Sequence, residues 1–173
     1  NISCAKETCS ILGITDSEFY QHIQSFKGAA KRLEIIRKND NAIIFRDFAH
    51  APSKLKATIA AVKKQYPKRK LIACIELHTF SSLNTNFLPQ YNGSMELADI
   101  GVVYYNINTI EHKKLSPLAK EHIIKYFGRN DIIVFNSSRE LINYIYSINM
   151  QNTNLLIMSS GNFDGIDFNE IAN

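Results

Sequence analysis

The sequence has few cysteines, no long apolar stretch and no signal at its start. Its three cysteines, Cys4, Cys9 and Cys74, form no CxxC pair, which argues against a disulfide framework or a zinc site and fits a reducing cytoplasm. No apolar run approaches the ~20 residues that a membrane-spanning helix needs, so we expect no membrane partner. The chain begins without Met and without a signal-peptide pattern, so we expect a piece of a longer protein.

Several chemical motifs are also missing. The sequence contains neither the G-x-x-x-x-G-K-[ST] phosphate loop nor the G-x-G-x-x-G dinucleotide fingerprint. No Ser–His–Asp or Cys–His arrangement stands in a recognisable local motif. No pair of His or Cys residues has the spacing of metal ligands, so we predict no metal site in this chain.

What is present is the composition of a soluble globular domain. The chain has 173 residues, of which 45% are hydrophobic and 21% are charged, enough for one domain with its own core. The net charge is +4, and the Lys and Arg residues are scattered except at residues 63–70. A solvated helix end and turn explains that stretch better than a phosphate-binding patch, so we expect no nucleic-acid partner.

The order of apolar patterns predicts an α/β fold. Residues 33–37 and 42–46 are β-rich runs on either side of a turn, so they are predicted to form a hairpin. Capping boxes at residues 15–18 and 137–140 predict two helix starts. The remaining predicted strands are residues 71–76, 100–105, 132–135 and 155–158, and the remaining predicted helices are residues 52–66 and 116–128. Alternation of strands and helices predicts a mostly parallel sheet covered by helices.

Polar residues follow the predicted strands, where ligands bind in an open parallel sheet. They are Asp47 and His50 after the second strand, His78 and Thr79 after the third, Asn106 after the fourth, and Ser159 to Phe163 after the last.

Each of these residues also has a purely structural interpretation. Asp47 could cap the next helix, and the histidines could be satisfied inside the fold. The Ser-Ser-Gly at residues 159–161 could be a plain turn or an anion-binding nest of N–H groups. Arg32, before the first strand, could be a surface charge or a phosphate clamp.

Taken together and in order, these segments resemble the C-terminal domain of the Mur ligases. Residues 26–34 read Phe-Lys-Gly-Ala-Ala-Lys-Arg-Leu-Glu, similar to the family's Phe-x-Gly followed by a basic pair and Glu. Residues 47–52 read Asp-Phe-Ala-His-Ala-Pro, similar to its Asp-aromatic-small-His-x-Pro motif. The resemblance assigns residues 1–25 to the tail of the preceding central ATPase domain and a linker, and residues 26–173 to the C-terminal domain.

The resemblance implies a fold and a reaction. The fold is a three-layer, Rossmann-like domain whose six-stranded sheet is mostly parallel with one antiparallel strand, with helices on both faces. In the reaction, ATP phosphorylates a carboxylate of UDP-N-acetylmuramate, and the amine of an amino acid or peptide attacks the acyl phosphate. Mg²⁺ and the phosphate loop belong to the family's central domain. The implied partners are therefore the N-terminal and central domains, and the isolated domain, with no catalytic residue of its own, is expected to be inactive.

Site residues follow from the resemblance by position. Arg32 would reach the ATP phosphates, Asp47 would bind the ribose and His50 would lie beside the nucleotide. The positions expected to face the incoming amine are His78, Thr79, Ser160, Gly161, Asn162 and Phe163.

The substrate class within the family is a finer question. Residues 158–166 read Met-Ser-Ser-Gly-Asn-Phe-Asp-Gly-Ile, similar to the ending of murein peptide ligases, which add L-alanyl-γ-D-glutamyl-meso-diaminopimelate. UDP-N-acetylmuramate–L-alanine ligases usually carry His-His-Pro and Pro-His-Arg-Tyr motifs. Here Ala51 replaces the second His and no Arg follows His78, which favours the tripeptide enzyme. Two further departures concern both groups: Arg46 stands where many members have an acid, and Asn162 where many have Gly.

Three alternatives stay open. The first is the L-alanine ligase. The second, from another class, is a non-catalytic Rossmann-like module that binds a nucleotide, which the missing phosphate loop would suit. The third is a folylpolyglutamate synthetase, which shares the superfamily but fits the motifs at residues 26–34 and 47–52 less well.

Overall fold

The computed structural model describes residues 2–26 and 28–168, and the chain divides into two compact units, Asn1–Ala30 and Lys31–Asn173. Lys27 of the Phe-x-Gly motif and residues 169–173 of the expected C-terminal domain lie outside the described residues. The domain boundary expected after residue 25 falls inside the first unit and stays a prediction.

The first unit contains two helices, α1 (Ile2–Ile11) and α2 (Asp16–Ile23). The capping box predicted for α2 is confirmed: the Glu18 N–H donates to Thr15 Oγ1 at 3.3 Å, and the Thr15 N–H donates to the Glu18 carboxylate at 2.9 Å. Helix α1 was not predicted.

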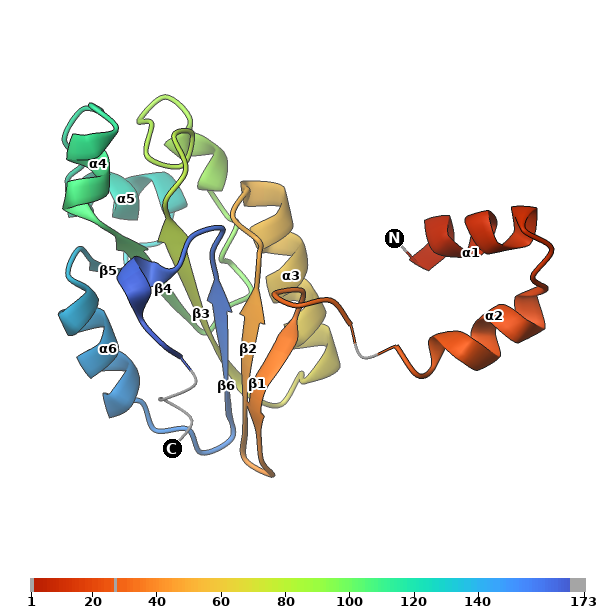
Figure 1. The fold of residues 1–173 in the computed structure, drawn as a ribbon. Coiled ribbons are helices and arrows are strands. Elements are labelled where there is room, and N and C mark those ends of the chain that lie inside the picture. The colour runs from red at the N-terminus through yellow and green to blue at the C-terminus, as the bar shows by residue number, and fades with distance from the viewer. Residues whose placement is uncertain (1, 27, 169–173) are drawn as a thin grey trace. The chain divides into compact units, whose positions relative to one another are not determined.

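The second unit is built on a six-stranded sheet with the order β1-β2-β6-β3-β4-β5 (Figure 1). Only β1 and β2 pair antiparallel, and the other four strand pairs are parallel. The strands are β1 (Glu34–Lys38), β2 (Ala42–Asp47), β3 (Lys70–Leu77), β4 (Ile100–Tyr105), β5 (Ile133–Phe135) and β6 (Thr153–Met158). The predicted mostly parallel sheet with one antiparallel strand is confirmed.

Helices cover both faces of this sheet (Figure 1). Helix α3 (Pro52–Gln65) buries Leu55, Ile59 and Val62 in the larger apolar cluster, because residues three and four apart share one helix face. The same cluster takes side chains from α4 (Ile107–His112), α5 (Lys120–Phe127) and the 3₁₀ turn η1 (Leu88–Tyr91). A second cluster on the opposite face takes side chains from α6 (Ser138–Ser147) and the 3₁₀ turn η2 (Phe163–Gly165).

Helix α5 begins later than the sequence predicts. Its expected start was at residue 116, but residues 115–119 are not helical and the helix starts at Lys120. The reason is tertiary: Leu118 is buried, and its carbonyl accepts a 2.8 Å hydrogen bond from the Tyr105 hydroxyl. The predicted stop is confirmed, because Gly128 adopts the left-handed conformation that ends many helices (φ 71°).

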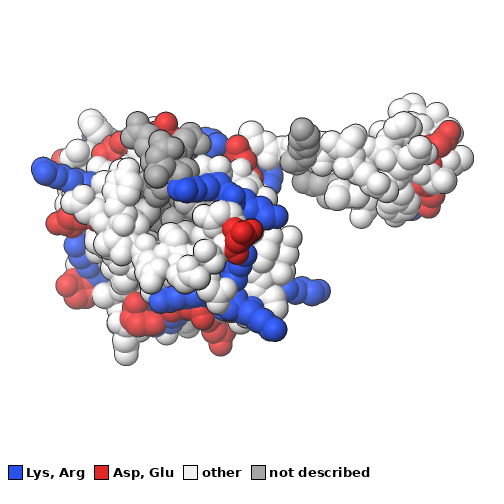
Figure 2. Space-filling view, turned by 90° about the horizontal axis from the view of Figure 1, so that it is seen from below, with Lys and Arg blue, Asp and Glu red and all other residues white. Residues whose placement is uncertain are grey.

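The surface carries charges of both signs. Seen from below the view of Figure 1, Lys and Arg side chains are interspersed with Asp and Glu side chains (Figure 2). Within the basic stretch at residues 63–70, Lys63 pairs with Asp99 at 2.5 Å and the Arg69 guanidinium lies 5.3 Å from the centroid of the Tyr66 ring. No helix within the described part of the chain is long and apolar enough to cross a membrane.

Candidate functional site

The parallel pairing brings the polar strand ends together at one edge of the sheet. Asp47 at the end of β2 is in register with Met158 of β6, and Leu77 at the end of β3 is in register with Tyr105 of β4. The residues that follow these strands therefore lie along the carboxyl edge, as the sequence predicted. They form two groups, one around Asp47 and one around a residue that sequence reasoning did not select, Glu76.

Asp47 ties the segment before β1 to the end of β2. One carboxylate oxygen accepts from the Leu33 N–H at 2.7 Å, and the other accepts from the Ala49 N–H at 2.7 Å and lies 3.5 Å from the Thr58 hydroxyl. Lys31 and Leu33 have positive φ values of 54° and 48°, which are unfavourable for these side chains. The Asp47 carboxylate thus forms a local turn with Ala49 and stabilises a strained segment. It does not cap the next helix, because the N-cap of α3 is Ala51 and makes no side-chain hydrogen bond.

Arg32 and His50 both lie against the Phe48 ring. The Arg32 guanidinium carbon is 5.1 Å from the ring centroid, and the His50 ring packs edge-on to Phe48 at 5.3 Å. His50 Nδ1 lies 2.9 Å from the Phe48 carbonyl oxygen, and because a carbonyl can only accept, Nδ1 is assigned as the donor. The three residues predicted for ATP therefore lie in one group.

Arg46, where many family members have an acid, has a partner of its own. Its guanidinium pairs with Glu34 at 3.0 Å, and Glu34 also accepts from the Lys31 N–H at 2.9 Å. The Lys31 N–H and the Arg46 guanidinium together lower the pKa of Glu34 despite its partial desolvation. The departure from the family pattern is thus compensated within the hairpin.

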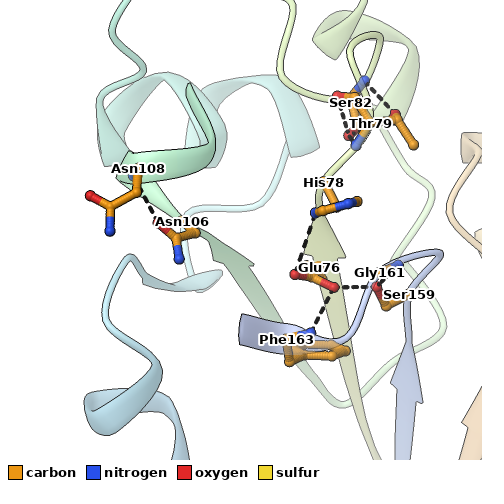
Figure 3. Close-up of polar contacts among 9 residues, drawn as sticks. All are labelled: Glu76, His78, Thr79, Ser82, Asn106, Asn108, Ser159, Gly161 and Phe163. Carbon is orange, nitrogen blue, oxygen red and sulfur yellow. Dashed lines mark hydrogen bonds and ion pairs between the residues drawn. The ribbon is translucent and has the colours of Figure 1, made fainter. Parts of the chain in front are cut away.

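Glu76 organises the second group (Figure 3). It lies on β3 with 3% of its surface exposed, and its Oε2 accepts from the Ser159 hydroxyl and from the Phe163 N–H, the latter at 3.0 Å. Its Oε1 lies 3.8 Å from His78 Nδ1. The Gly161 N–H donates to Ser159 Oγ at 2.6 Å. The segment of residues 159–163, here named the closing turn, is therefore folded around one carboxylate.

Gly161 has to be a glycine for steric reasons. A Cβ at this position would lie 2.7 Å from Glu76 Oε2 and 2.9 Å from His78 Cγ, closer than real Cβ contacts. Gly161 therefore allows the closing turn to approach β3 closely.

The other predicted residues of the closing turn differ in accessibility. Asn162 is exposed, whereas the Ser160 hydroxyl is buried without a hydrogen-bond partner among the described residues. Phe163 is buried and stacks on Tyr104, with ring centroids 5.9 Å apart. Burial raises the pKa of Tyr104 to about 12, so this stacking partner is uncharged at neutral pH. Phe163 thus contributes its N–H and core packing, and Asn162 is the side chain free to face a ligand.

His78 and Thr79 also differ from each other. The His78 side chain is 40% exposed, so its ring is accessible at the carboxyl edge. The Thr79 hydroxyl takes part in a local turn with Ser82. It lies 3.0 Å from the Ser82 hydroxyl and accepts from the Ser82 N–H at 3.1 Å (Figure 3). Next to them, Phe80 is exposed and the Lys113 ammonium lies 4.0 Å from its ring centroid.

Asp47 and the closing turn line one pocket. This pocket of about 90 Å³ is lined by Lys31, Arg46 and Asp47 and by Gly161, Asn162 and Phe163, but not by Arg32 or His50. No group of three or more His, Cys, Asp or Glu side chains within the described ranges is arranged to hold a metal ion. Lys31 and Arg46 give this pocket two cationic side chains beside the Asp47 carboxylate and the closing turn, a lining that suits a polar organic ligand with an anionic group.

The sequence carries a signal for Glu76. It is the one acid within the apolar run Leu-Ile-Ala-Cys-Ile-Glu-Leu at residues 71–77, and a charge on a buried strand needs a partner to offset its desolvation. That rule identifies Glu76 as important, but the identity of its partners requires the fold.

A family model and a curated relative identify the same family. A sequence model of the family "Mur ligase, glutamate ligase domain" matches residues 31–161. The UDP-N-acetylmuramate–L-alanine ligase of Caldicellulosiruptor bescii is 35% identical over 123 residues, which are 71% of this chain and 26% of that protein.

Several solved structures share the fold, including a murein peptide ligase and a MurF ligase. A murein peptide ligase from Psychrobacter arcticus is 24% identical with a TM-score of 0.65, over 99% of this chain and 35% of its own. A MurF ligase from Thermotoga maritima, solved in complex with ADP, is 16% identical with a TM-score of 0.58, over 98% of this chain and 34% of its own. The chain therefore spans about a quarter to a third of the length of the proteins that it resembles.

Proposed function

The chain belongs to the Mur ligase family, and we propose that it is the C-terminal domain of a cytoplasmic ATP-dependent ligase that joins L-alanyl-γ-D-glutamyl-meso-diaminopimelate to UDP-N-acetylmuramate. In this reaction the muramate carboxylate takes the γ-phosphoryl group of ATP, and ADP leaves. The tripeptide amine then attacks the acyl phosphate, and an amide forms as inorganic phosphate leaves. Mg²⁺ and the phosphate loop would come from the central domain, so the domain alone would be inactive.

The observation that carries this proposal is the placement of two groups around one pocket. On the Asp47 side, Arg32, which follows Lys31 of the pocket lining, presents a guanidinium with no salt-bridge partner in the described segments, which suits a phosphate. Asp47 still has acceptor capacity, because a carboxylate offers about four lone-pair sites and three donors approach it. On the other side, the closing turn presents Asn162. A nucleotide on the Asp47 side would place its phosphates near an amine held by the closing turn. The ADP complex of the MurF neighbour supports a nucleotide as ligand.

The tripeptide is proposed from the closing turn. Its sequence, with Gly161 packed against Glu76 and His78, is similar to that of murein peptide ligases, and the chain lacks the second His and the Arg usual in L-alanine ligases. A second candidate is UDP-N-acetylmuramate–L-alanine ligase, favoured by the Caldicellulosiruptor bescii relative. A non-catalytic nucleotide-binding module is the alternative from another class.

Phosphate release by the full-length parent enzyme tests these alternatives. The enzyme is supplied with ATP, Mg²⁺ and UDP-N-acetylmuramate, with L-alanine in one tube and the tripeptide in another. We expect release with the tripeptide. Release with L-alanine alone would assign the enzyme to the second candidate, and release with neither would favour the non-catalytic module. The 173-residue chain by itself is the control and should release no phosphate.

A further inference from the structure

We propose that Glu76 is a positioning residue that holds the closing turn in the shape that receives the incoming amine. This inference rests on the proposed function and deepens it, because it names a residue of strand β3 that shapes the segment proposed to face the amine. Glu76 itself need not touch the substrate. It acts through Ser159, Phe163 and His78, which surround its carboxylate (Figure 3).

The first argument is the strength of the anchor. Glu76 is almost completely buried, and Oε2 accepts from one hydroxyl and one N–H of the closing turn. Hydrogen bonds to a buried carboxylate are stronger than neutral ones, and a buried charge without them is strongly unfavourable. The carboxylate and the closing turn therefore stabilise each other, and the turn is fixed to β3 rather than only to its own strand.

The second argument is that the closing turn is strained and has little other support. Phe163 and Asp164 have positive φ values of 50° and 59°, which cost energy for residues with side chains. The 3₁₀ turn that starts at Phe163 has no side-chain hydrogen bond at its N-cap, Asn162. Without the acceptor on Glu76, the Phe163 N–H would be buried and unpaired, and the turn would relax. The position of Asn162 would change with it.

The third argument is that the same carboxylate faces His78. Oε1 lies 3.8 Å from His78 Nδ1, and Gly161 lets the closing turn pack against both side chains. Glu76 therefore links the two segments, at the ends of β3 and β6, that are predicted to face the amine. The group predicted for ATP is held separately by Asp47. Loss of Glu76 should consequently affect amine binding and leave ATP binding unchanged.

Two substitutions in the full-length enzyme test the proposal. Glu76→Ala removes the acceptor and should raise the KM for the amine by about tenfold or more, with the KM for ATP unchanged within about twofold. Glu76→Gln can place its amide oxygen where Oε2 lies and accept from both donors. The KM of Glu76→Gln for the amine should therefore stay within a few-fold of the wild-type value.

Asp99→Ala is the matched control. Asp99 also accepts from a backbone N–H, that of Leu71 at 2.7 Å, and from a side chain, that of Lys63 at 2.5 Å. It lies where β3 and β4 begin, away from the carboxyl edge. Its loss should lower the thermal midpoint without changing the amine KM. If Asp99→Ala raises the amine KM as much as Glu76→Ala does, the effect of Glu76 is general destabilisation and the proposal is wrong.

A second variant keeps the test decisive if Glu76→Ala folds poorly. Ser159→Ala removes one of the two donors that Glu76 holds and should raise the KM for the amine with the KM for ATP unchanged. An unchanged KM for the amine, or a change in the KM for ATP instead, would overturn the positioning role. A wild-type enzyme that releases phosphate with neither amine would instead refute the proposed function, which the phosphate-release test detects separately.

Discussion

Asp47 and Glu76 are two buried carboxylates at the same edge of the sheet: Asp47 lines a pocket there, and Glu76 holds the closing turn that also lines it. Asp47 accepts from N–H groups of residues 14 and 2 positions away, Leu33 and Ala49. Glu76 accepts from Ser159 and Phe163, which are 83 and 87 positions away. Both stabilise backbone with positive φ values, at Leu33 in one case and Phe163 in the other. The difference lies in whether the contacts are local or long-range in sequence.

That difference has a functional consequence under the proposed reaction. The contacts of Asp47 all come from segments close to it in sequence, the residues before β1, the loop after β2 and helix α3. The contacts of Glu76 exist only when β6 has paired with β3. Substitutions at the two carboxylates should therefore separate ATP binding from amine binding, and the predictions below follow from that separation.

Asp47→Ala should have the largest effect. It leaves the Leu33 and Ala49 N–H groups without their acceptor, at a cost of about 2–4 kcal/mol in unfolding free energy, and it removes the predicted ribose contact. In the full-length enzyme the KM for ATP should rise at least about tenfold while the KM for the amine stays near the wild-type value. Thr58→Ala is the control, because its hydroxyl lies 3.5 Å from the same carboxylate. Wild-type ATP kinetics in Asp47→Ala would refute the nucleotide role.

Gly161→Ala should act on the closing turn. The new Cβ would lie 2.7 Å from Glu76 Oε2 and force the closing turn away from β3, at a cost of about 1–3 kcal/mol. We expect a several-fold rise in the KM for the amine at an unchanged KM for ATP, measured by phosphate release. Gly165→Ala is a useful comparison: its φ of 84° strains a side chain, yet nothing lies within 4 Å. Equal amine KM values in the two variants would argue against the steric explanation.

The same contrast between local and long-range contacts explains what the sequence could predict. The strands at residues 71–76 and 100–105 were found because both are buried on two faces and read as continuous apolar runs. Asp47 was selected because its motif is local. Glu76 was missed because its partners Ser159 and Phe163 follow a different strand, β6, and only the folded sheet brings them to β3. Helix α4 was missed because it spans only six residues, although Asn106 accepts from the Asn108 N–H as its N-cap at 2.7 Å (Figure 3).

Tyr91→Phe should produce a smaller effect on the Asp47 side. The Tyr91 hydroxyl donates to the His50 carbonyl at 2.5 Å, while its ring stacks on Phe127 with centroids 5.0 Å apart. The substitution keeps the stacking and removes one buried hydrogen bond, so the unfolding free energy should fall by about 1–2 kcal/mol. Burial raises the pKa of Tyr91, so this decrease in unfolding free energy should not vary with pH near neutrality. Denaturant unfolding at several pH values measures the decrease, and a decrease that depends on pH would contradict this account.

Asp99→Asn should have the smallest effect and tests whether any hydrogen-bonded carboxylate would behave like Asp47 and Glu76. Partial burial pushes the pKa of Asp99 up, but the hydrogen bonds from Lys63 and the Leu71 N–H outweigh it and hold the pKa below the ordinary 3.8. A carboxyl with a lowered folded-state pKa contributes stability above its unfolded pKa, and the contribution is lost as the pH falls below about 4. Because its side chain is 41% exposed, that contribution should be below about 1 kcal/mol. Thermal midpoints from pH 7 to pH 3 should converge for the wild type and Asp99→Asn at the acid end. A difference in thermal midpoint that persists at pH 3 would contradict the stabilising role of the Asp99 charge. A change in either KM at pH 7 would mean that this distant carboxylate is coupled to the site. The separate roles assigned to Asp47 and Glu76 would then not be specific to the carboxyl edge.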